Sequence, residues 1–484
     1  MKNSSLIEII NSLDNQEIKK LRSFLISPYF NHNKNVTRLF DFIISHNKES
    51  RITLNKKELH DNVFSSREYN NENIKTIIYL TTRLCERFLV INSIENNSPE
   101  YTRKLLGIFD IKGLDKLFLN HLNKTSGRKS QAPIFSLNSA AEENEYEKTL
   151  IEFYSKRNFE KEMFIHEQKL SESLIAAFLI DMFKQYNIFW RTGYLDNIKG
   201  NEFTTALLGS LDTKKLFKFF NDNKFRYNSL LMPYYEIHCL LNETRERVNF
   251  HSIKEHILMN TAISGDEKFV LSTILVNTLY YKNLKSGGYF SRDLFEAYKL
   301  LVQLYEYSGE QYLRFTIFSN VLRMGLQLGE FEWTEEFIHK YHVFLEPSTK
   351  NNMLNYSNAY LSFSKGDFEM CLEYESKINF ETFQQRYYLR DLRLCSLYEL
   401  GKYETALNLI DSYKHFIKKD QNYTAKMKQG YLLFMRHIND LIRLKLGISR
   451  KNVSDIKEKL LISLPMRKDW LINKFEEIEH KLTK

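Results

Sequence analysis

A four-residue motif recurs in the C-terminal half of the chain at nearly constant spacing. Its copies are Gly329-Glu330-Phe331-Glu332, Gly366-Asp367-Phe368-Glu369 and Gly401-Lys402-Tyr403-Glu404. The intervals are 37 and 35 residues, a period typical of repeats built from two helices and a turn. Such a unit cannot bury its apolar face alone and must stack on its neighbours. The motif therefore predicts an α-solenoid.

The low content of helix-breaking residues extends this prediction to the rest of the chain. Only 6 Pro and 16 Gly occur among 484 residues, and both residue types interrupt helices. The length exceeds what one ordinary hydrophobic core accommodates. Hydrophobic residues make up 43% of the chain, enough apolar surface to order most of it. We therefore predict an all-α protein of more than one part.

The first part is predicted to be a small helical domain over residues 1–120. Asp14 and Glu17 have the spacing of a capping box, and Ser27-Pro28 ends the helix that this box begins. Further helices are predicted to begin near Asn55 and Asn71. Four helices in about 90 residues suffice for a compact domain with its own core.

A change in amino-acid composition after residue 120 predicts two further parts of the chain. Polar and turn-forming residues between 121 and 140 predict a linker or exposed loop. Helical periodicity resumes afterwards, so residues 141–484 are predicted to be the helical-repeat domain. Pro465 precedes a segment that carries Leu471 and Phe475 on one face, which predicts a C-terminal capping helix.

The repeated motif resembles the tetratricopeptide repeat. Units of that family have a Gly at the turn between two antiparallel helices, an aromatic residue two positions later and a small residue five positions after the Gly. Gly401, Tyr403 and Ala406 match all three positions, whereas Thr or Cys takes the third position in the other two units. The resemblance covers about residues 312–420 and implies an α-solenoid of antiparallel helix pairs, with degenerate pairs on its N-terminal side.

The resemblance also implies a binding groove. In that family the first helix of each pair lines a concave groove for a peptide or helix, at positions 13, 10 and 6 residues before the Gly. In this sequence those positions are occupied by Thr316, Ser319, Arg323, Met353, Tyr356, Tyr360, Tyr388, Asp391 and Cys395. Aromatic residues, Met and Arg are enriched at interfaces, so a protein or peptide partner is expected. The alternative is that the tyrosines fill gaps between helices.

We find no catalytic signature in the sequence. The glycine-rich phosphate-binding motifs and the Gly-x-Ser-x-Gly elbow are absent, and the four cysteines include no Cys-x-x-Cys pair. The best metal-like grouping is Glu335, His339 and His342 on one helical face, which surface helices often produce by chance. We therefore expect a non-enzymatic protein with no cofactor and no metal.

The formal charge of +9 is distributed unevenly. Residues 1–130 carry a net charge of +7, residues 131–410 carry −6 and residues 411–484 carry +8. Basic ends on an acidic middle are compatible with self-association or with a polyanionic partner.

An alternative function is a nucleic-acid-binding regulator, with a helix-turn-helix-like N-terminal domain and the repeats as sensor or dimerisation domain. The helix that begins at Asn71 would present Lys75, Arg83 and Arg87 to the phosphates. Against this, the connection from Phe64 to Asn70 is longer than the turn of a usual helix-turn-helix. The protein–protein function is therefore preferred.

The sequence also gives an expectation for location. The N-terminal segment places Glu8 inside its apolar stretch and has no small-residue cleavage site. Apolar runs such as Leu174–Ile180 are far shorter than the ~20 residues needed to cross a bilayer. We expect a cytoplasmic protein without membrane insertion.

Overall fold

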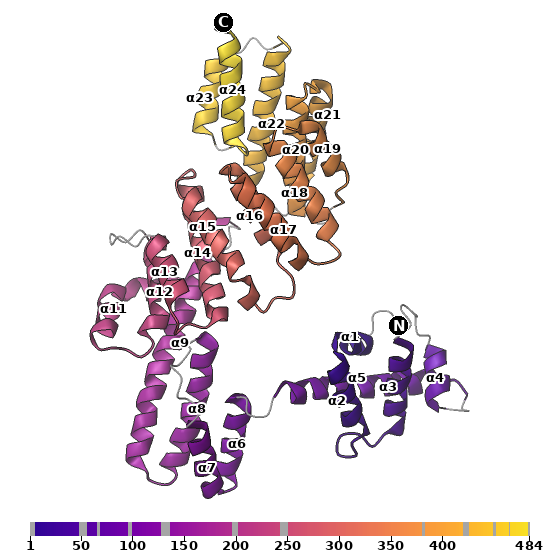
Figure 1. Cartoon of the computed structure of the whole chain (residues 1–484), viewed down its shortest axis with the longest axis vertical. Coiled ribbons are helices and arrows are strands. Elements are labelled where there is room, and N and C mark those ends of the chain that lie inside the picture. Colours follow the sequence, from indigo (N-terminus) through magenta and orange to yellow (C-terminus); the bar gives the residue numbers. More distant parts are fainter. Residues whose placement is uncertain are drawn as a thin grey trace. The chain divides into compact units, whose positions relative to one another are not determined.

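The chain forms two compact units (Figure 1). Unit 1 comprises residues 1–128 and 149–159, and unit 2 comprises residues 129–148 and 160–484. The structure, a computed structural model, describes residues 5–47, 56–64, 68–94, 99–126, 136–195, 202–242, 250–379, 383–419, 425–448, 452–463 and 465–482. These residues form twenty-four α-helices, two short 3₁₀ helices and no strand, which confirms the predicted all-α class.

Five helices build the main core of unit 1. They are α1 (Ser5–Ser12), α2 (Asn15–Ile26), α3 (Lys34–Asn47), α4 (Lys56–Phe64) and α5 (Asn71–Ser93). Side chains from all five are buried together, among them Leu39 and Phe40 of α3 and Ile74 of α5. Each helix thus contributes one apolar face to a shared core.

The start and end of α2 follow the sequence prediction. The Asp14 carboxylate accepts hydrogen bonds from the backbone N–H groups of Gln16 and Glu17, at 2.7 and 2.8 Å. The Glu17 carboxylate in turn accepts from the backbone N–H of Asp14 at 3.1 Å, which completes the capping box. The helix ends at Ile26, before Pro28.

The rest of unit 1 comes from α6 (Pro99–Ile111), α7 (Asp115–Ser126) and the C-terminal part of α8 (Leu137–Ser155). The Phe118 and Phe153 rings stack with their centroids 3.6 Å apart. Arg157, just beyond α8, donates to the Asp110 carboxylate at 2.8 Å and also pairs with Asp115. An aromatic stack and a shared guanidinium therefore join α8 to the α6–α7 hairpin.

The segment predicted as a linker, residues 121–140, is helical at both ends. Helix α7 continues to Ser126 and α8 begins at Leu137, while residues 127–135 lie outside the described residues. The compact units also divide the chain elsewhere than the predicted boundaries, because residues 149–159 belong to unit 1. Sequence character alone did not indicate that α8 contributes to both units.

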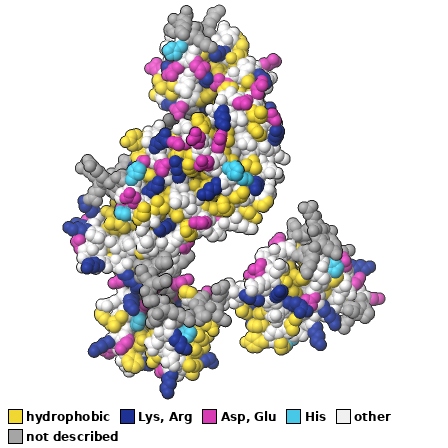
Figure 2. Space-filling model, in the orientation of Figure 1, with side chains coloured by type: hydrophobic (Ala, Val, Ile, Leu, Met, Phe, Trp, Pro, Cys, Tyr) yellow, Lys and Arg dark blue, Asp and Glu magenta, His cyan; other side chains and the backbone are white. Residues whose placement is uncertain are grey.

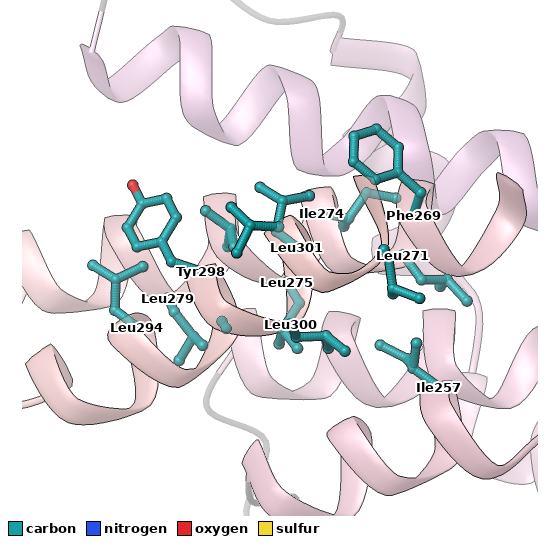
Figure 3. Packing of buried hydrophobic residues seen from close by; sticks show 14 of the residues in the cluster. Ile257, Phe269, Leu271, Ile274, Leu275, Leu279, Leu294, Tyr298, Leu300 and Leu301 are labelled. Carbon is teal, nitrogen blue, oxygen red and sulfur yellow. The ribbon is translucent and has the colours of Figure 1, made fainter. Parts of the chain in front are cut away.

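Unit 2 begins with the N-terminal part of α8 and continues with helices that pack on their neighbours. Its next elements are α9 (Glu160–Leu195), α10 (Glu202–Ser210), α11 (Thr213–Asp222), α12 (Asn228–Asn242), α13 (Phe250–Met259), α14 (Gly265–Lys285), α15 (Ser291–Gln303) and a 3₁₀ turn (Tyr305–Tyr307). Figure 3 shows how α13, α14 and α15 pack: Leu275 and Leu279 of α14 lie against Leu300 and Leu294 of α15, with Ile257 of α13 at one end. Burial of apolar side chains on both faces of α14 holds these helices together.

Three hairpins follow, each with a copy of the repeated motif at its turn. They are α16 (Phe315–Gln327) with α17 (Phe331–Tyr341), α18 (Lys350–Ser364) with α19 (Phe368–Ser376), and α20 (Phe383–Glu399) with α21 (Tyr403–Lys419); a 3₁₀ turn, His342–Phe344, follows α17. The helices of each hairpin pack against each other, and α18 also contacts α16 and α20. Helix pairs stacked on their neighbours are compatible with helical repeats.

The turns of the three hairpins have the same hydrogen bonds. Gly329, Gly366 and Gly401 have φ of 76°, 82° and 69°, in the left-handed region that favours glycine. In every case the residue after the Gly donates its N–H to a carbonyl five residues earlier, at 2.9 Å. The Gly itself donates to a carbonyl three residues earlier. These two bonds define a Schellman motif, which satisfies carbonyls left free at the end of the first helix.

The C-terminal helices are α22 (Ala425–Lys445), α23 (Val453–Ile462) and α24 (Lys468–Leu482). Helix α24 packs on α22 and α23 and buries Leu471, Phe475 and Ile478. Its Trp470 indole N–H donates to the Glu399 carboxylate at the end of α20, at 3.0 Å. Across the described part of the chain, no helix combines the length and apolarity that a membrane span requires.

Candidate functional site

The first helices of the three hairpins bring several of the predicted groove residues together. Arg323 of α16, Tyr356 and Tyr360 of α18, and Tyr388 and Asp391 of α20 form a connected set, which Arg467 joins from the turn before α24. We call these six residues the arginine–tyrosine cluster. Of the six, only Arg467 was not predicted from the sequence.

Arg323 is held between α16 and α20. Its guanidinium carbon lies 3.8 Å from the centre of the Tyr388 ring. Nη2 donates to the Asn320 side-chain oxygen at 2.6 Å, and Nε donates to the Ser319 carbonyl at 3.3 Å. The side chain is partly exposed. The ring contact and the two hydrogen bonds fix the plane of the guanidinium, and its remaining N–H groups can donate to a ligand.

Arg467 lies near the tyrosines of α18 as well. Its guanidinium carbon lies 5.8 Å from the Tyr360 ring centre and 5.3 Å from that of Phe363. The residue has φ of 51°, a left-handed conformation that costs a non-glycine residue energy. No sequence signal marks this position, because it is 76 positions from Asp391 and outside the repeated motif.

Asp391 is the one acidic member of the cluster and is buried in α20. One of its carboxylate oxygens accepts a hydrogen bond from the Tyr413 hydroxyl at 2.9 Å. Burial raises the pKa of Asp391 to about 7, against the opposing attraction of Arg467, the Tyr413 hydrogen bond and the attraction of Arg323. Its charge therefore changes near neutral pH.

The cluster carries more positive than negative charge. Neither Arg323 nor Arg467 forms an ion pair with a carboxylate anywhere in the described ranges, and the Arg467 side chain makes no hydrogen bond there. Burial raises the pKa of Tyr356 and Tyr360, so these hydroxyls stay neutral. Two guanidiniums beside neutral hydroxyls suit an anionic group, since Arg binds carboxylates through paired N–H donors.

Two of the predicted groove residues are placed differently from the expectation. Met353 and Tyr356 have no exposed surface and belong to the hydrophobic core of unit 2, so a partner cannot touch them directly. They are buried because α18 packs against α16 on one side and α19 and α20 on the other. For these two residues the structure corresponds to the alternative in which long side chains fill gaps between helices.

The remaining residues selected by the tetratricopeptide pattern also differ in exposure. Thr316 is exposed, whereas Ser319 and Cys395 are buried. Only part of each first helix is therefore accessible, which leaves Arg323, Tyr388 and Arg467 as the partly exposed members of the arginine–tyrosine cluster.

The turn residues have structural positions. Phe368 and Tyr403 each place their ring beside an aromatic ring five residues earlier, at 5.5 Å from Phe363 and 5.8 Å from Tyr398. Phe331 is partly exposed. The position five residues after each Gly is fully buried, as Thr334, Cys371 and Ala406.

The described residues include no group of three or more His, Cys, Asp or Glu side chains that could hold a metal ion. In the metal-like grouping, Glu335 pairs with Lys365, and His342 faces backbone carbonyls through Nδ1. The four cysteines are buried and none forms a disulfide. Burial raises the pKa of Cys371 to about 11, which makes this thiol a poor nucleophile near neutral pH.

The residues of the nucleic-acid alternative lie on α5 in unit 1. Lys75 pairs with Glu72 at 2.7 Å, and Arg83 pairs with Glu86 at 3.1 Å. Arg87 instead lies over the Phe30 ring, at 5.1 Å from its centre. Two of the three cations thus already face carboxylates of their own helix, which weakens the case for a surface devoted to phosphates.

Comparisons with protein-family models, curated proteins and solved structures each give no match for this chain.

Proposed function

We propose that this protein is a non-enzymatic, cytoplasmic interaction protein whose tetratricopeptide-like hairpins bind an acidic segment of a partner protein. The observation that supports the proposal is the arginine–tyrosine cluster. Arg323 and Arg467 are partly buried cations that form no ion pair in the described ranges, and Asp391 is the one acid of the cluster that attracts them. An Asp or Glu side chain of a bound segment would add an ion-pair partner, and the partly exposed Tyr388 ring would supply apolar contact.

The charges of the arginine–tyrosine cluster are incompletely paired in the free protein. A buried charge needs compensation, and the only acid in the cluster is protonated for part of the time at neutral pH, because its pKa lies near 7. Bringing in a second carboxylate therefore neutralises existing charge rather than adding new charge to a buried site. The cost of removing the two guanidiniums from water is already met in the free protein, which favours binding.

Selection of random peptides by the full-length protein tests the proposal. The selected peptides should share an Asp or Glu whose replacement by Asn or Gln weakens binding about tenfold or more. Arg323→Gln and Arg467→Gln should each weaken binding of the best peptide to a similar degree. Arg314→Gln is the matched control, because Arg314 is an exposed residue just before α16 that already pairs with Glu310.

Peptides without a shared acid, or equal loss in the Arg314→Gln control, would contradict the proposal. Truncation of Tyr356 is not a useful test, since this residue is fully buried and its loss would report on folding. Hydrogen exchange of α16, α18 and α20 in each variant distinguishes lost binding from lost structure.

A further inference from the structure

Unit 1 contains an open cleft of about 900 Å³ between the α2–α3 connection and one side of α5. The connection contributes residues from Phe30 to Val36, and α5 contributes residues from Leu80 to Val90. All of these residues lie within unit 1 and are described by the structure. The cleft is separate from the arginine–tyrosine cluster of unit 2.

The α5 side of the cleft carries a stripe of apolar side chains that Arg87 interrupts. Leu80, Leu84, Arg87 and Ile91 are spaced by four, three and four residues, so they lie on one side of the helix, with Ile91 just beyond the cleft lining. Leu80 and Ile91 are exposed, and so is Val90, of which 64% is accessible. The buried face of α5, with Ile74, Ile77 and Phe88, points to the core instead. Exposed apolar side chains in a row mark an interaction surface more often than a solvated one.

Positive charge accompanies this stripe. Lys34 and Arg87 line the cleft and form no ion pair within the described ranges, while the neighbouring Arg83 pairs with Glu86. Arg87 is held in place by the Phe30 ring. Figure 2 shows basic and apolar side chains next to each other on the visible face of unit 1. Two cations without an ion pair beside the exposed Leu80 and Val90 complement a segment that is both apolar and acidic.

We infer that this cleft is a docking site for an acidic amphipathic helix of a partner protein. A helix fits because the stripe on α5 spans about three turns, and apolar side chains at spacings of three and four on the partner would face it. Acidic residues flanking that face would reach Lys34 and Arg87. Nucleic acid fits less well, since Glu86 also lines the cleft and phosphate contacts would leave the exposed Leu80 and Val90 uncovered.

The test uses the full-length protein and three labelled peptides of about 14 residues, long enough for four helical turns. The first has Leu at spacings of three and four with Glu at the flanking positions. The second replaces every Glu with Gln, and the third replaces every Glu with Lys. Fluorescence anisotropy should show the Glu peptide binding about tenfold or more tightly than the Gln peptide, and the Lys peptide not binding.

Charge reversal in the protein gives a result that misfolding cannot imitate. Arg87→Glu should weaken binding of the Glu peptide and create binding of the Lys peptide. Val90→Asp should weaken the binding of every peptide, whereas Lys75→Glu, outside the cleft on the same helix, should change nothing. Failure of the peptide selection on unit 2 would leave these results unaffected, because the two surfaces share no residue.

Three outcomes would overturn the inference. Equal binding of the Glu and Gln peptides would show that charge has no part in recognition. Salt-sensitive binding of a random DNA duplex that Arg87→Glu abolishes, without binding of the Glu peptide, would assign the surface to nucleic acid. A dimer that Val90→Asp dissociates, again without peptide binding, would assign it to a second copy of this chain.

Discussion

Gly325 is a residue whose small size is required by its neighbours. It lies in α16, four residues before the turn, and is buried. A Cβ atom at this position would overlap the Thr334 hydroxyl of α17 and come within 3.3 Å of the Phe295 ring. The two helices of this hairpin therefore approach most closely where Gly325 meets Thr334.

Gly325→Ala should lower the free energy of unfolding by about 1 to 3 kcal/mol, because the extra methyl group overpacks this crossing. Combining it with Thr334→Ala should cost less than the sum of the two single changes, since the overlapping atom is removed. Gly329→Ala is the control: its cost comes from a φ of 76° in open space, so Thr334→Ala should not relieve it. Urea denaturation of the three single and two double variants measures these differences, and additivity at Gly325 would contradict the packing argument.

Asp391 gives a prediction for pH. Its folded-state pKa of about 7 lies above the usual value near 4, so between these pH values the folded chain holds a proton that the unfolded chain has lost. The free energy of unfolding contributed by this residue should therefore fall as pH rises from about 4 to 7, and stay low above that range.

Asp391→Asn removes this titration. The stability of the variant relative to the natural protein should thus increase between pH 4 and pH 8, by at most about 4 kcal/mol. Denaturation at several pH values measures the trend. Asp411→Asn, on the exposed side of α21, is the matched control and should lack it. The same trend in both variants would mean that burial of Asp391 is not the cause.

Helix α21 offers a test of how far the destabilisation caused by one substitution extends along the chain. Ala406 is fully buried in a core formed by α20 to α24. Ala406→Leu should overpack that core at a cost of about 1 to 3 kcal/mol. In a stacked array the contacts are mostly between neighbours, so hydrogen exchange should lose protection in α20 to α24 and not in α1 to α5. The adjacent exposed position gives the control, Thr405→Leu; uniform loss across the chain would contradict a repeat architecture.

The individual helix signals show which parts of the fold the sequence could predict. The Asp14 box and the glycine turns are local, because the residues that form them are three to six positions apart and their conformational preferences are strong. The same turn also ends helices at Asn158 and at Lys224, with φ of 59° and 53°. Asn tolerates this conformation, whereas Lys has no such preference, so its sequence does not mark the turn.

The candidate site was harder to predict, because it depends on distances through space. Arg323, Tyr388 and Asp391, which the spacing before each Gly selected, lie near one another. It could not show that Met353 and Tyr356 are covered on all sides, since burial depends on how hairpins stack. Nor could it find Arg467, which reaches the tyrosines from a turn outside the repeats.

For the molecule as a whole, the two compact units predict separate stabilities. Leu39 lies in the core of α1 to α5, and Leu441 lies in the core of α20 to α24; both are fully buried. Leu39→Ala and Leu441→Ala should each cost about 2 to 5 kcal/mol. Hydrogen exchange in the full-length protein should show each loss only in the unit that carries the change, and loss of protection in both units from either change would show that they unfold together.

The identical turns at Gly366 and Gly401 have a consequence for how such a chain can change over evolutionary time. Each turn is closed by backbone hydrogen bonds, so it does not depend on which hairpin it belongs to. A duplicated or deleted segment can begin directly after one of these glycines and end at the next. The two sequences that then become adjacent form the same turn. The chain can then lengthen or shorten by whole repeats, whereas an insertion or deletion of any other size would disrupt the turn in which it falls.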